Sequence, residues 1–364
     1  MNKYYIGLMS GTSLDAIDAV IVERSDQGFQ QVAGISPDLS PFLREKFLKI
    51  CNDKHVDLQT LGEVDHQFAL ACAEVVNQLL DQSGFTAKDI TAIGSHGQTI
   101  YHDPLGKFPF THQIGDPNLM AAKTGIPCVG DFRRMDMAYG GQGAPIVPAF
   151  HQALFAKKDA TRVILNIGGI ANITLLTSDQ DVLGYDTGAG NMLMDAWIGK
   201  IQGKTFDKNG EFAQQGVVLP SLLTKLLADP YFALPAPKST GREKFNLAWL
   251  LPQLTGTERP QDIQRTLLEF TATTITEQIK FYSTNSAVYV CGGGALNALL
   301  MTRLQALMPK QLVTTTHALN IDPLFLEAVA FAWLAEQRIL EKPTQLKKIT
   351  GASKDTILGG LYIP

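Results

Sequence analysis

The stretch YYIGLMSGTSLDAIDAVIV, residues 4–22, decides the fold that the sequence predicts. An apolar run meets a small polar corner, SGTS at residues 10–13, and a β-branched run follows at once. This pattern predicts a β-hairpin with a glycine corner. Backbone N–H groups and hydroxyls that converge at such a corner can bind a phosphate oxygen, although an ordinary N-terminal hairpin has the same local pattern.

The same pattern recurs later in the chain. Residues 162–176, RVILNIGGIANITLL, again indicate a strand, a glycine corner and a strand, and residues 288–295, VYVCGGGA, indicate a buried strand that runs into three glycines. Glycine has no Cβ, so another molecule can approach such a backbone closely. Two phosphate-sized corners a domain apart predict a duplicated fold that holds one ligand from both sides. The order of the three corners resembles the fold shared by actin, sugar kinases and heat-shock ATPases.

The composition is that of a globular enzyme. A chain of 364 residues is too long for one ordinary core, so two domains are expected. Hydrophobic residues make up 45% and charged residues 18%, which argues against disorder, and a net charge of -4 without a basic run argues against a nucleic-acid partner. No apolar stretch approaches the roughly 20 residues of a membrane span, and the chain enters a strand without a signal peptide, so a cytoplasmic location is expected.

Several familiar motifs are absent. The four cysteines and seven histidines are scattered without metal-ligand spacing, so the cysteines are expected to be reduced and structural. The tripeptide Gly203-Lys204-Thr205 has the tail of a P-loop, but Ile198 stands where the first glycine is needed. No glycine pair has the third glycine of a dinucleotide fingerprint. Any nucleotide must therefore be held in another way.

Polar side chains follow two predicted strands of the first half. His96 follows the strand expected at residues 90–94, where open α/β sheets place ligands, so it is a candidate substrate contact or else a structural histidine. Arg133 and Arg134 follow the strand at 126–130, and one of them could hold a carboxylate in a bidentate fork unless both are merely solvated. The glycine-rich segment 138–145 suits a hinge, a loop against a ligand or a plain linker, and a domain boundary is expected nearby.

The second half offers two candidate carboxylates. Asp186 leaves a strand into a glycine-rich turn just before a helix, so it is either the leading catalytic carboxylate or a turn aspartate. Glu327 lies in the first turn of the helix expected at 324–340, where the helix dipole alone would favour it. The charged loop 238–243 is expected on the surface, where it could cover the nucleotide. Helical spacing also predicts core helices that start at Thr60, with a capping box to Glu63, and at residue 261.

A series of motifs resembles the anhydro-N-acetylmuramic acid kinase family. The motifs follow the family's order over nearly the whole chain: GLMSGTSLD (7–15), GSHGQTI (94–100), DFRR (131–134), GGQGAP (140–145), NIGG (166–169), Asp186-Thr187-Gly188 with Gly190-Asn191, KSTGRE (238–243) and CGGGA (291–295). Two departures, Ala16 and Ala189, stand where Gly and Pro are expected, and both concern loop geometry more than chemistry. The resemblance implies an α/β, two-domain, duplicated actin-like ATPase (ribonuclease H-like) fold with a central ligand cleft and an interdomain hinge.

The resemblance also implies an activity. Such an enzyme of bacterial cell-wall recycling uses ATP and water to convert 1,6-anhydro-N-acetylmuramic acid into N-acetylmuramic acid 6-phosphate. Water attacks the anomeric carbon while the leaving sugar oxygen takes the γ-phosphoryl group, and the position that matches the family's general base is Asp186. A homodimer is implied as well.

The remaining site residues are carried over in the same way. Two corners would cradle the phosphates with Mg²⁺ bridging them, and a third would lie against the adenosine: Gly11, Thr12 and Ser13; Gly168 and Gly169; and Gly292, Gly293 and Gly294. Asp15 would help to hold the hydrated metal, or is simply a strand-end residue, and the other metal ligands are unknown. Arg133 would bind the lactyl carboxylate of the substrate, and His96 and Glu327 would contact the sugar.

The expected domains are residues 1–137 with 342–364, which carry the first corner and the sugar contacts, and residues 138–341, which carry the second corner, Asp186 and the adenosine loop. Two other functions remain open. An ATPase-only switch of the same fold would turn over ATP without regard to the sugar. A nucleotide-independent hydrolase of the anhydro sugar, with Asp186 and Glu327 as paired carboxylates, would open the ring without ATP.

Overall fold

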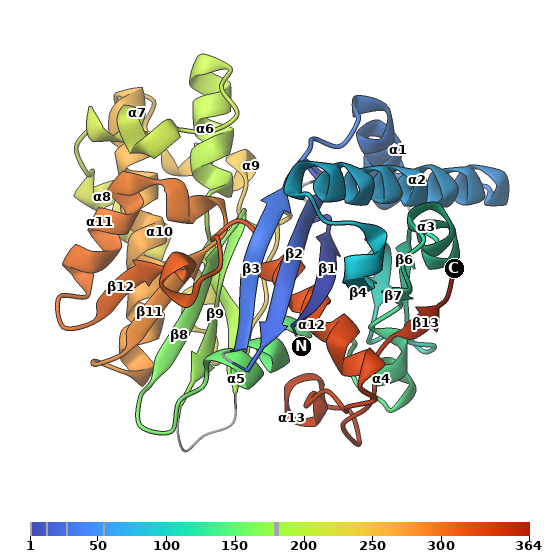
Figure 1. Ribbon diagram of the computed structural model, residues 1–364. Helices are drawn as coiled ribbons and strands as arrows, with labels where there is room; N and C mark the ends of the chain where they lie inside the picture. The colour runs from blue at the N-terminus through green and yellow to red at the C-terminus, as the bar shows by residue number, and fades with distance from the viewer. Residues whose placement is uncertain (1, 12–13, 27, 54, 178–181) are drawn as a thin grey trace. The chain divides into compact units, whose positions relative to one another are not determined.

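Two compact units make up the chain in the computed structural model, which describes residues 2–11, 14–26, 28–53, 55–177 and 182–364 (Figure 1). Unit 1 comprises Met1–Leu154 with Phe325–Pro364, and unit 2 comprises Phe155–Leu324. The divisions therefore fall about 17 residues further along the chain than the predicted boundary at 137/138 and about 17 residues before the one at 341/342.

Each unit is built on one mixed sheet, and five strands have the same order in both sheets when these are read from opposite edges, with β13 added in unit 1. The sheet of unit 1 runs β13-β7-β4-β1-β2-β3 and that of unit 2 runs β10-β9-β8-β11-β12. In both, the first three strands form an antiparallel meander, and the fourth and fifth strands continue parallel to the first. The predicted duplicated α/β fold is confirmed by this topology.

The strands of the two sheets have the following bounds: β1 Lys3–Met9, β2 Asp18–Ser25, β3 Gly28–Ile35, β4 Ile90–Ser95, β7 Cys128–Gly130 and β13 Gly360–Tyr362 in unit 1, and β8 Arg162–Ile167, β9 Ile170–Leu176, β10 Leu183–Ala189, β11 Ala287–Cys291 and β12 Leu312–Thr315 in unit 2. A separate hairpin in unit 1 consists of β5 Gln98–Asp103 and β6 Phe110–Ile114.

The helices are as follows: α1 Pro41–Asp53, α2 Leu58–Ser83, α3 Pro117–Thr124, α4 Arg134–Ala138, α5 Val147–Phe155, α6 Met192–Gln202, α7 Glu211–Gln214, α8 Pro220–Leu227, α9 Leu247–Leu250, α10 Pro260–Tyr282, α11 Ala298–Leu307, α12 Leu326–Ile339 and α13 Lys347–Thr350. Short 3₁₀ turns are η1 Ala87–Asp89, η2 Lys208–Gly210, η3 Pro230–Ala233, η4 Leu251–Gln253, η5 Gly293–Leu296 and η6 Thr316–Leu319. Within the described residues, no helix is both long enough and apolar enough to cross a bilayer.

Helix α12 packs on the central strands of unit 1. Ile6 and Leu8 of β1 belong to the apolar core that also contains residues of α1 and α2. The intervening Gly7 faces the other way, where an added Cβ would clash with the Ala328 carbonyl oxygen, and Gly94 on β4 stands in the same relation to Phe331. Because two glycines let the backbone of α12 approach the sheet, this helix belongs to unit 1.

The glycine-rich segment 140–145 is also part of unit 1. The buried Asp136 carboxylate accepts hydrogen bonds from the Gly143 N–H at 2.8 Å and from the Thr350 hydroxyl at 2.7 Å. Gln142 donates its N–H to the Thr350 carbonyl oxygen at 3.0 Å. The segment is thus fastened to the C-terminal residues of its own unit, and the chain divides later, at Leu154 and Phe155.

Helix α2 begins one turn before the predicted capping box at Thr60 and Glu63. The Asp57 carboxylate accepts a hydrogen bond from the Thr60 N–H at 2.8 Å and so forms the N-cap. The prediction of its end is confirmed, because Gly84 terminates the helix with φ +75°.

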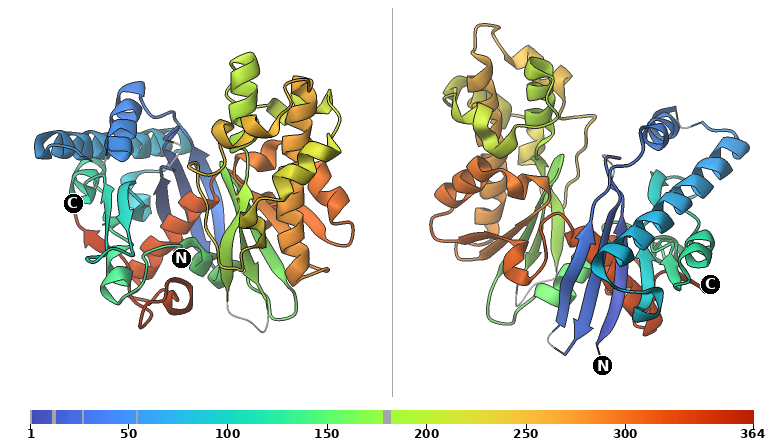
Figure 2. Two further views of the ribbon diagram at one scale, coloured as in Figure 1. Left: turned by 180° about the vertical axis from the view of Figure 1, so that it is seen from behind. Right: turned by 45° about the horizontal axis from the view of Figure 1, so that its top comes forward.

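In unit 2 the long helix α10 packs against β10 and against α6, α7, α8 and α11 (Figure 2). Its predicted buried face is confirmed by Ile263, Leu267, Phe270, Ile275 and Ile279, all of which lie in the core. Burial of such side chains stabilises a fold by roughly 1.5–3 kcal/mol each. This core supports β10, the strand that carries Asp186.

Candidate functional site

Unit 1 brings together three predicted site residues, His96, Arg133 and Glu327. His96 directly follows β4, and its N–H donates to the Leu8 carbonyl oxygen at 3.1 Å. The Arg133 guanidinium donates through Nη2 to Nε2 of His96 at 2.8 Å and through Nη1 to the Gly143 carbonyl oxygen at 2.8 Å. Glu327, in the first turn of α12, lies near His96 and Arg133. Glu327 and Arg133 each shift the pKa of the other.

His96 is a neutral imidazole in this setting. Its side chain is 6% exposed, and burial together with the Arg133 charge lowers its pKa to about 3. Since a guanidinium only donates, Nε2 of His96 is the acceptor and the ring proton sits on Nδ1. The imidazole therefore offers a donor to a ligand without adding a charge.

Arg133 is a partly buried cation. Burial lowers the pKa of Arg133 to about 10, and the Glu327 carboxylate opposes that shift. The guanidinium remains charged at neutral pH, in surroundings where water screens it poorly. Arg134, the alternative candidate, is 54% exposed at its side chain and lies 3.6 Å from the Asp131 carboxylate. The geometry thus favours Arg133 as the residue that recognises an anion.

Asp18 is a neighbour of this group that the sequence reasoning did not single out. It is the first residue of β2 and accepts a hydrogen bond from the Ser36 hydroxyl at 2.6 Å. Burial raises the pKa of Asp18, and the pKa of Glu327 is raised by burial first and by Asp18 second. The position of this second carboxylate follows from the tertiary structure. Strand β1 pairs with β2 so that Asp18 lies opposite Met9, and α12 packs on both strands.

The first predicted phosphate corner is only partly described. Gly11 accepts a hydrogen bond from the Leu14 N–H at 3.1 Å, while Thr12 and Ser13 lie outside the described residues. The side chain of Asp15 is 64% exposed and pairs with Arg44 at 3.1 Å. Any metal contact of Asp15 would therefore compete with this ion pair.

In unit 2, Asp186 lies in β10 opposite Asn172, where the pairing with β9 is irregular. Its carboxylate oxygen Oδ2 accepts a hydrogen bond from the Thr240 N–H at 3.0 Å, and none of the described residues donates to Oδ1. Burial raises the pKa of Asp186, and the Thr240 bond partly offsets the rise. A partly buried carboxylate with a raised pKa and one free oxygen is suited to act as a general base.

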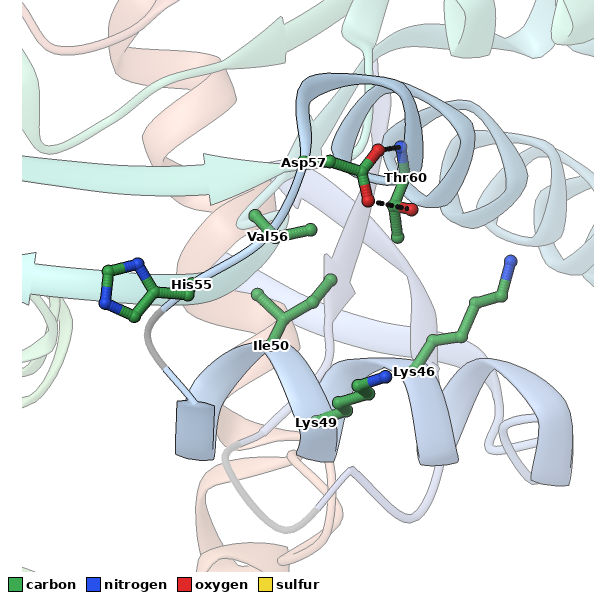
Figure 3. Close-up of a pocket in the computed structure, with 7 residues that line it drawn as sticks. All are labelled: Lys46, Lys49, Ile50, His55, Val56, Asp57 and Thr60. Carbon is green, nitrogen blue, oxygen red and sulfur yellow. Dashed lines mark hydrogen bonds between the residues drawn. The ribbon is translucent and has the colours of Figure 1, made fainter.

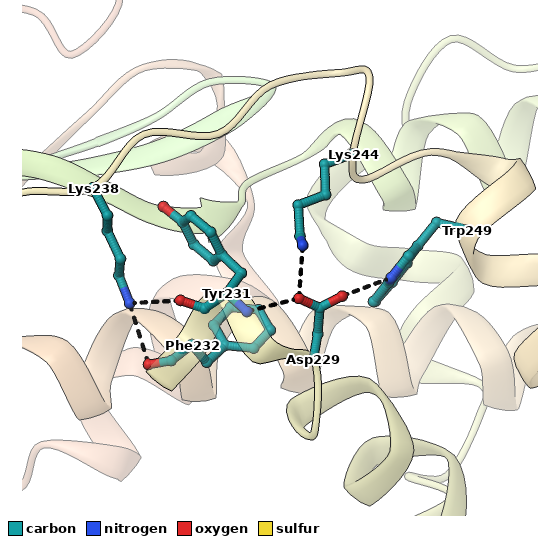
Figure 4. A network of polar contacts seen from close by, with 6 residues as sticks. All are labelled: Asp229, Tyr231, Phe232, Lys238, Lys244 and Trp249. Atoms are coloured by element: carbon teal, nitrogen blue, oxygen red, sulfur yellow. Dashed lines mark hydrogen bonds and ion pairs between the residues drawn. The ribbon is translucent and has the colours of Figure 1, made fainter. Parts of the chain in front are cut away.

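In the loop 238–243, Ser239, Arg242 and Glu243 are exposed as predicted, but Lys238 is buried. Lys238 is 7% exposed, and its ammonium group donates to the carbonyl oxygens of Tyr231 and Phe232, each at 3.2 Å (Figure 4). The Lys238 carbonyl oxygen accepts the Asp186 N–H at 3.0 Å. This loop is therefore the immediate surroundings of Asp186. The lysine in a polar run gave no signal of burial in the sequence.

The second phosphate corner and the triple glycine lie at the ends of neighbouring strands. Strands β8 and β11 pair in parallel with Cys291 opposite Asn166, so Gly168 and Gly292 follow at the same edge of the sheet. Gly168 and Gly169 accept hydrogen bonds from the backbone N–H groups of the turn before α6, at 2.8 to 3.2 Å. The corner is thereby closed against the turn that follows Asp186.

The space for a Cβ atom differs among the three glycines 292–294. Gly292 has φ +79°, and an added Cβ would clash with the side chain of Asn166, while a Cβ on Gly294 would clash with Ile167. A Cβ on Gly293, which is exposed, would find its nearest heavy atom at 3.7 Å. The chain itself therefore requires two of these glycines, and only Gly293 is left to serve a ligand.

Among the described residues, no group of three or more His, Cys, Asp or Glu side chains converges on one point. A hollow of about 340 Å³ lies between α1 and α2 and is lined by Lys46, Lys49, His55 and neighbours (Figure 3). Its carboxylate, Asp57, is occupied as the N-cap of α2. None of the predicted site residues lines this hollow.

Comparison with known proteins gives a consistent result. The sequence profile of the family described as anhydro-N-acetylmuramic acid kinase matches residues 3–364. A protein of that name from Pasteurella multocida (strain Pm70) is 51% identical, covering 99% of this chain and 96% of its own. One from Vibrio parahaemolyticus is 50% identical, with 99% and 98% covered.

Solved structures are more distant. The activator of 2-hydroxyisocaproyl-CoA dehydratase from Clostridium difficile, with bound ADPNP, is 13% identical, covers 96% of this chain and 100% of its own, and has a TM-score of 0.49. A ROK family glucokinase from Streptomyces griseus in complex with glucose and AMPPNP is 12% identical, covers 92% and 99%, and has a TM-score of 0.42.

Proposed function

Because the chain belongs to the anhydro-N-acetylmuramic acid kinase family, we propose that it converts 1,6-anhydro-N-acetylmuramic acid, ATP and water into N-acetylmuramic acid 6-phosphate and ADP in the recycling of peptidoglycan. The oxygen of water bonds to the anomeric carbon as the bond from that carbon to O6 breaks. O6 takes the γ-phosphoryl group of ATP, and one proton of the water is released to a base.

Asp186 is the base in this mechanism. The observation that carries the assignment is its carboxylate in β10, with Oδ2 fixed by the Thr240 N–H at 3.0 Å and Oδ1 without a donor among the described residues. An ionised Oδ1 can accept a proton from the attacking water. General base catalysis of this kind contributes about 10² to 10⁴ in rate.

Arg133, His96 and Glu327 bind the sugar. The partly buried guanidinium of Arg133 is the cation for the lactyl carboxylate, which a charge-assisted hydrogen bond would hold. The neutral imidazole of His96 offers its Nδ1 proton to a sugar oxygen. Glu327, whose pKa burial raises, contacts a sugar hydroxyl as donor or acceptor according to its protonation. Arg133 and His96 already bond to each other at 2.8 Å, which supports a shared ligand.

ATP is held mainly by backbone. The corners that contain Gly11, with Thr12 and Ser13, and Gly168 with Gly169 would cradle its phosphates, and Gly293 would lie against the adenosine. Since no described cluster of side chains suits a metal ion, Mg²⁺ would be held by phosphate oxygens and water, with Asp15 outside its direct coordination. When bound, Mg²⁺ supplies neutralisation of the phosphate charge.

The two other functions make different use of these residues. A switch that only hydrolyses ATP has no use for the buried cation Arg133 beside His96. A hydrolase without a nucleotide needs paired carboxylates but has no use for the glycine corners expected to bind phosphates and adenosine. Neither function accounts for the family to which the chain belongs.

The cellular location and the assembly are part of the same proposal. The enzyme would act in the cytoplasm, where ATP is present, and as a homodimer. Light scattering on the eluting peak of a gel-filtration column would measure the mass, and a mass near 40 kDa would contradict the dimer, since one chain has a mass of 39.6 kDa.

The proposed function is tested by ADP release with and without 1,6-anhydro-N-acetylmuramic acid in ¹⁸O-labelled water. We expect sugar-dependent ADP, label at the anomeric hydroxyl and phosphate on O6, and a fall in kcat of about 10² to 10⁴ in Asp186→Asn. Glu211→Gln, which changes an exposed carboxylate on α7, is the control and should behave as wild type. ADP release that ignores the sugar, or ring opening without ATP, would contradict the proposal.

A further inference from the structure

The backbone of Asp186 makes hydrogen bonds to residues outside the sheet. The register of β10 against β9 shifts between Asp186 and Gly188, and the Asp186 N–H donates to the Lys238 carbonyl oxygen at 3.0 Å. Such irregularities in a strand redirect a side chain. The orientation of the Asp186 carboxylate therefore depends on what holds its two peptide groups.

Two segments outside the sheet hold them. The Tyr231 hydroxyl in η3 donates to the Asp186 carbonyl oxygen at 2.6 Å. The segment 238–240 accepts the Asp186 N–H at one end and donates the Thr240 N–H to its carboxylate at the other. Asp186 is thus fixed at its N–H, its C=O and one carboxylate oxygen.

Lys238 ties these two segments together. Its ammonium group bonds to the Tyr231 and Phe232 carbonyl oxygens and lies 4.8 Å from the centre of the Tyr231 ring (Figure 4). Burial lowers the pKa of Lys238, and among the described residues no carboxylate lies within ion-pair distance of its ammonium. The ammonium is therefore held by two carbonyl oxygens of η3 and not by an ion pair, so the side chain links the segment 238–240 to η3.

The far end of η3 is anchored separately. The Asp229 carboxylate accepts the Tyr231 N–H at 2.9 Å and the Trp249 indole N–H at 3.0 Å, and it pairs with Lys244 at 2.8 Å. Burial of Tyr231, which is 3% exposed, and these bonds make η3 a rigid support. The hydroxyl of Tyr231 is thereby presented to Asp186 from a fixed position.

We propose that Tyr231 and Lys238 are positioning residues for Asp186, an inference that rests on Asp186 being the base in the proposed function. Tyr231 fixes the Asp186 peptide, and Lys238 keeps the segment that carries the Thr240 N–H in register with it. Misplacement of a reacting group by about 1 Å can cost about 10²-fold in rate. Loss of either side chain should therefore lower kcat and leave the KM values for sugar and ATP nearly unchanged.

The test is Tyr231→Phe, which removes one hydroxyl. We expect kcat to fall about 10-fold to 100-fold. The acid limb of the pH profile of kcat should move to higher pH, because the Thr240 N–H bond lowers the pKa of Asp186 and a loosened bond lets that pKa rise. Lys238→Met should act in the same direction.

The matched control is Tyr185→Phe. Tyr185 precedes Asp186 in β10, is also buried, and its hydroxyl donates to the side chain of Gln278 at 3.0 Å without touching Asp186. Each Tyr→Phe variant removes one hydroxyl from a buried tyrosine, and the Tyr185 hydroxyl also interacts with Tyr282. We expect the melting temperature to fall in both variants, whereas only Tyr231→Phe should lose kcat and shift its pH profile.

Three outcomes would count against the inference or its premise. Wild-type kcat and pH profile in Tyr231→Phe would overturn the inference. An equal loss of kcat in Tyr185→Phe would assign Tyr231 a structural role and overturn it as well. If Asp186→Asn, measured in parallel, kept wild-type kcat, the assignment of Asp186 as the base would fail and the inference would lose its premise. ADP release that ignores the sugar would instead contradict the proposed function, so the failures are distinguishable.

Discussion

The residues that follow the fourth strand differ between the two sheets. In unit 1, β4 runs into Ser95 and His96, beside the Arg133 guanidinium. In unit 2, β11 runs into the glycines 292–294, where backbone alone is presented. The strand order is the same, so the topology provides the place and the side chains decide its use. The charged, side-chain-rich end suits the recognition of a sugar acid, and the glycine end suits a nucleotide.

The carboxylates of the two units differ in the same way. Burial raises the pKa of both Glu327 and Asp186. The pKa of Glu327 also responds to a second carboxylate, Asp18, and to a cation, Arg133, whereas the pKa of Asp186 responds, besides burial, to the hydrogen bond from the Thr240 N–H. We therefore expect Glu327 to respond to the charge of the substrate and Asp186 to respond to the backbone that holds it.

The largest effect should follow Arg133→Met. Loss of this partly buried cation should raise the KM for 1,6-anhydro-N-acetylmuramic acid by about 10²-fold, because the substrate carboxylate would lose its charged partner. The same variant should show little change with 1,6-anhydro-N-acetylglucosamine, which lacks the lactyl carboxylate. Arg134→Met is the matched control, because Arg134 is exposed. An equal rise of KM with both sugars would show that Arg133 does not recognise the lactyl carboxylate.

A smaller effect is expected at the glycine end. Gly293→Ala should fold normally, since its Cβ has nothing nearer than 3.7 Å, but it should raise the KM for ATP by about tenfold, or about 1.4 kcal/mol. Gly294→Ala should instead lower the melting temperature, because its Cβ would clash with Ile167. An unchanged KM for ATP in Gly293→Ala would show that this turn does not contact the nucleotide.

The smallest effect is the pH dependence of stability at Glu327. Its pKa is raised on folding, so the folded state binds a proton more tightly than the unfolded chain, and stability from this group is lost as pH rises through the folded pKa. Glu327→Gln should therefore melt above wild type at about pH 8, and the difference should close towards the ordinary glutamate pKa of about 4.3. Thermal melts from about pH 4 to pH 8 measure this.

Glu74→Gln, which changes an exposed carboxylate on α2, controls for the change of net charge. If the melting temperatures of Glu327→Gln and wild type differed by the same amount at every pH, the titration of the buried Glu327 carboxylate would not be the cause of the difference.

Local signals predicted the elements better than their ends or their neighbours. Hairpins β1–β2 and β8–β9 were predicted because strand runs around glycine corners depend on neighbouring residues only. The start of α2 was missed by one turn because Asp57 and Thr60 are both good caps, and only the geometry shows that Asp57 accepts the Thr60 N–H. The glycine content of the segment 138–145 predicts a boundary nearby, but it does not reveal that Asp136 and Thr350 fasten this segment to unit 1.

The sequence by itself determined the duplicated fold, the family and the candidate residues, because glycine corners, strand periodicity and collinear motifs are written in the order of the chain. Tertiary structure decided what surrounds those residues. The carboxylate pair of Asp18 with Glu327 joins strand and helix more than 300 residues apart, and the Tyr231–Lys238 support of Asp186 joins three separate segments. Burial and hydrogen bonds across such separations set pKa values and orientation, and no local pattern records them.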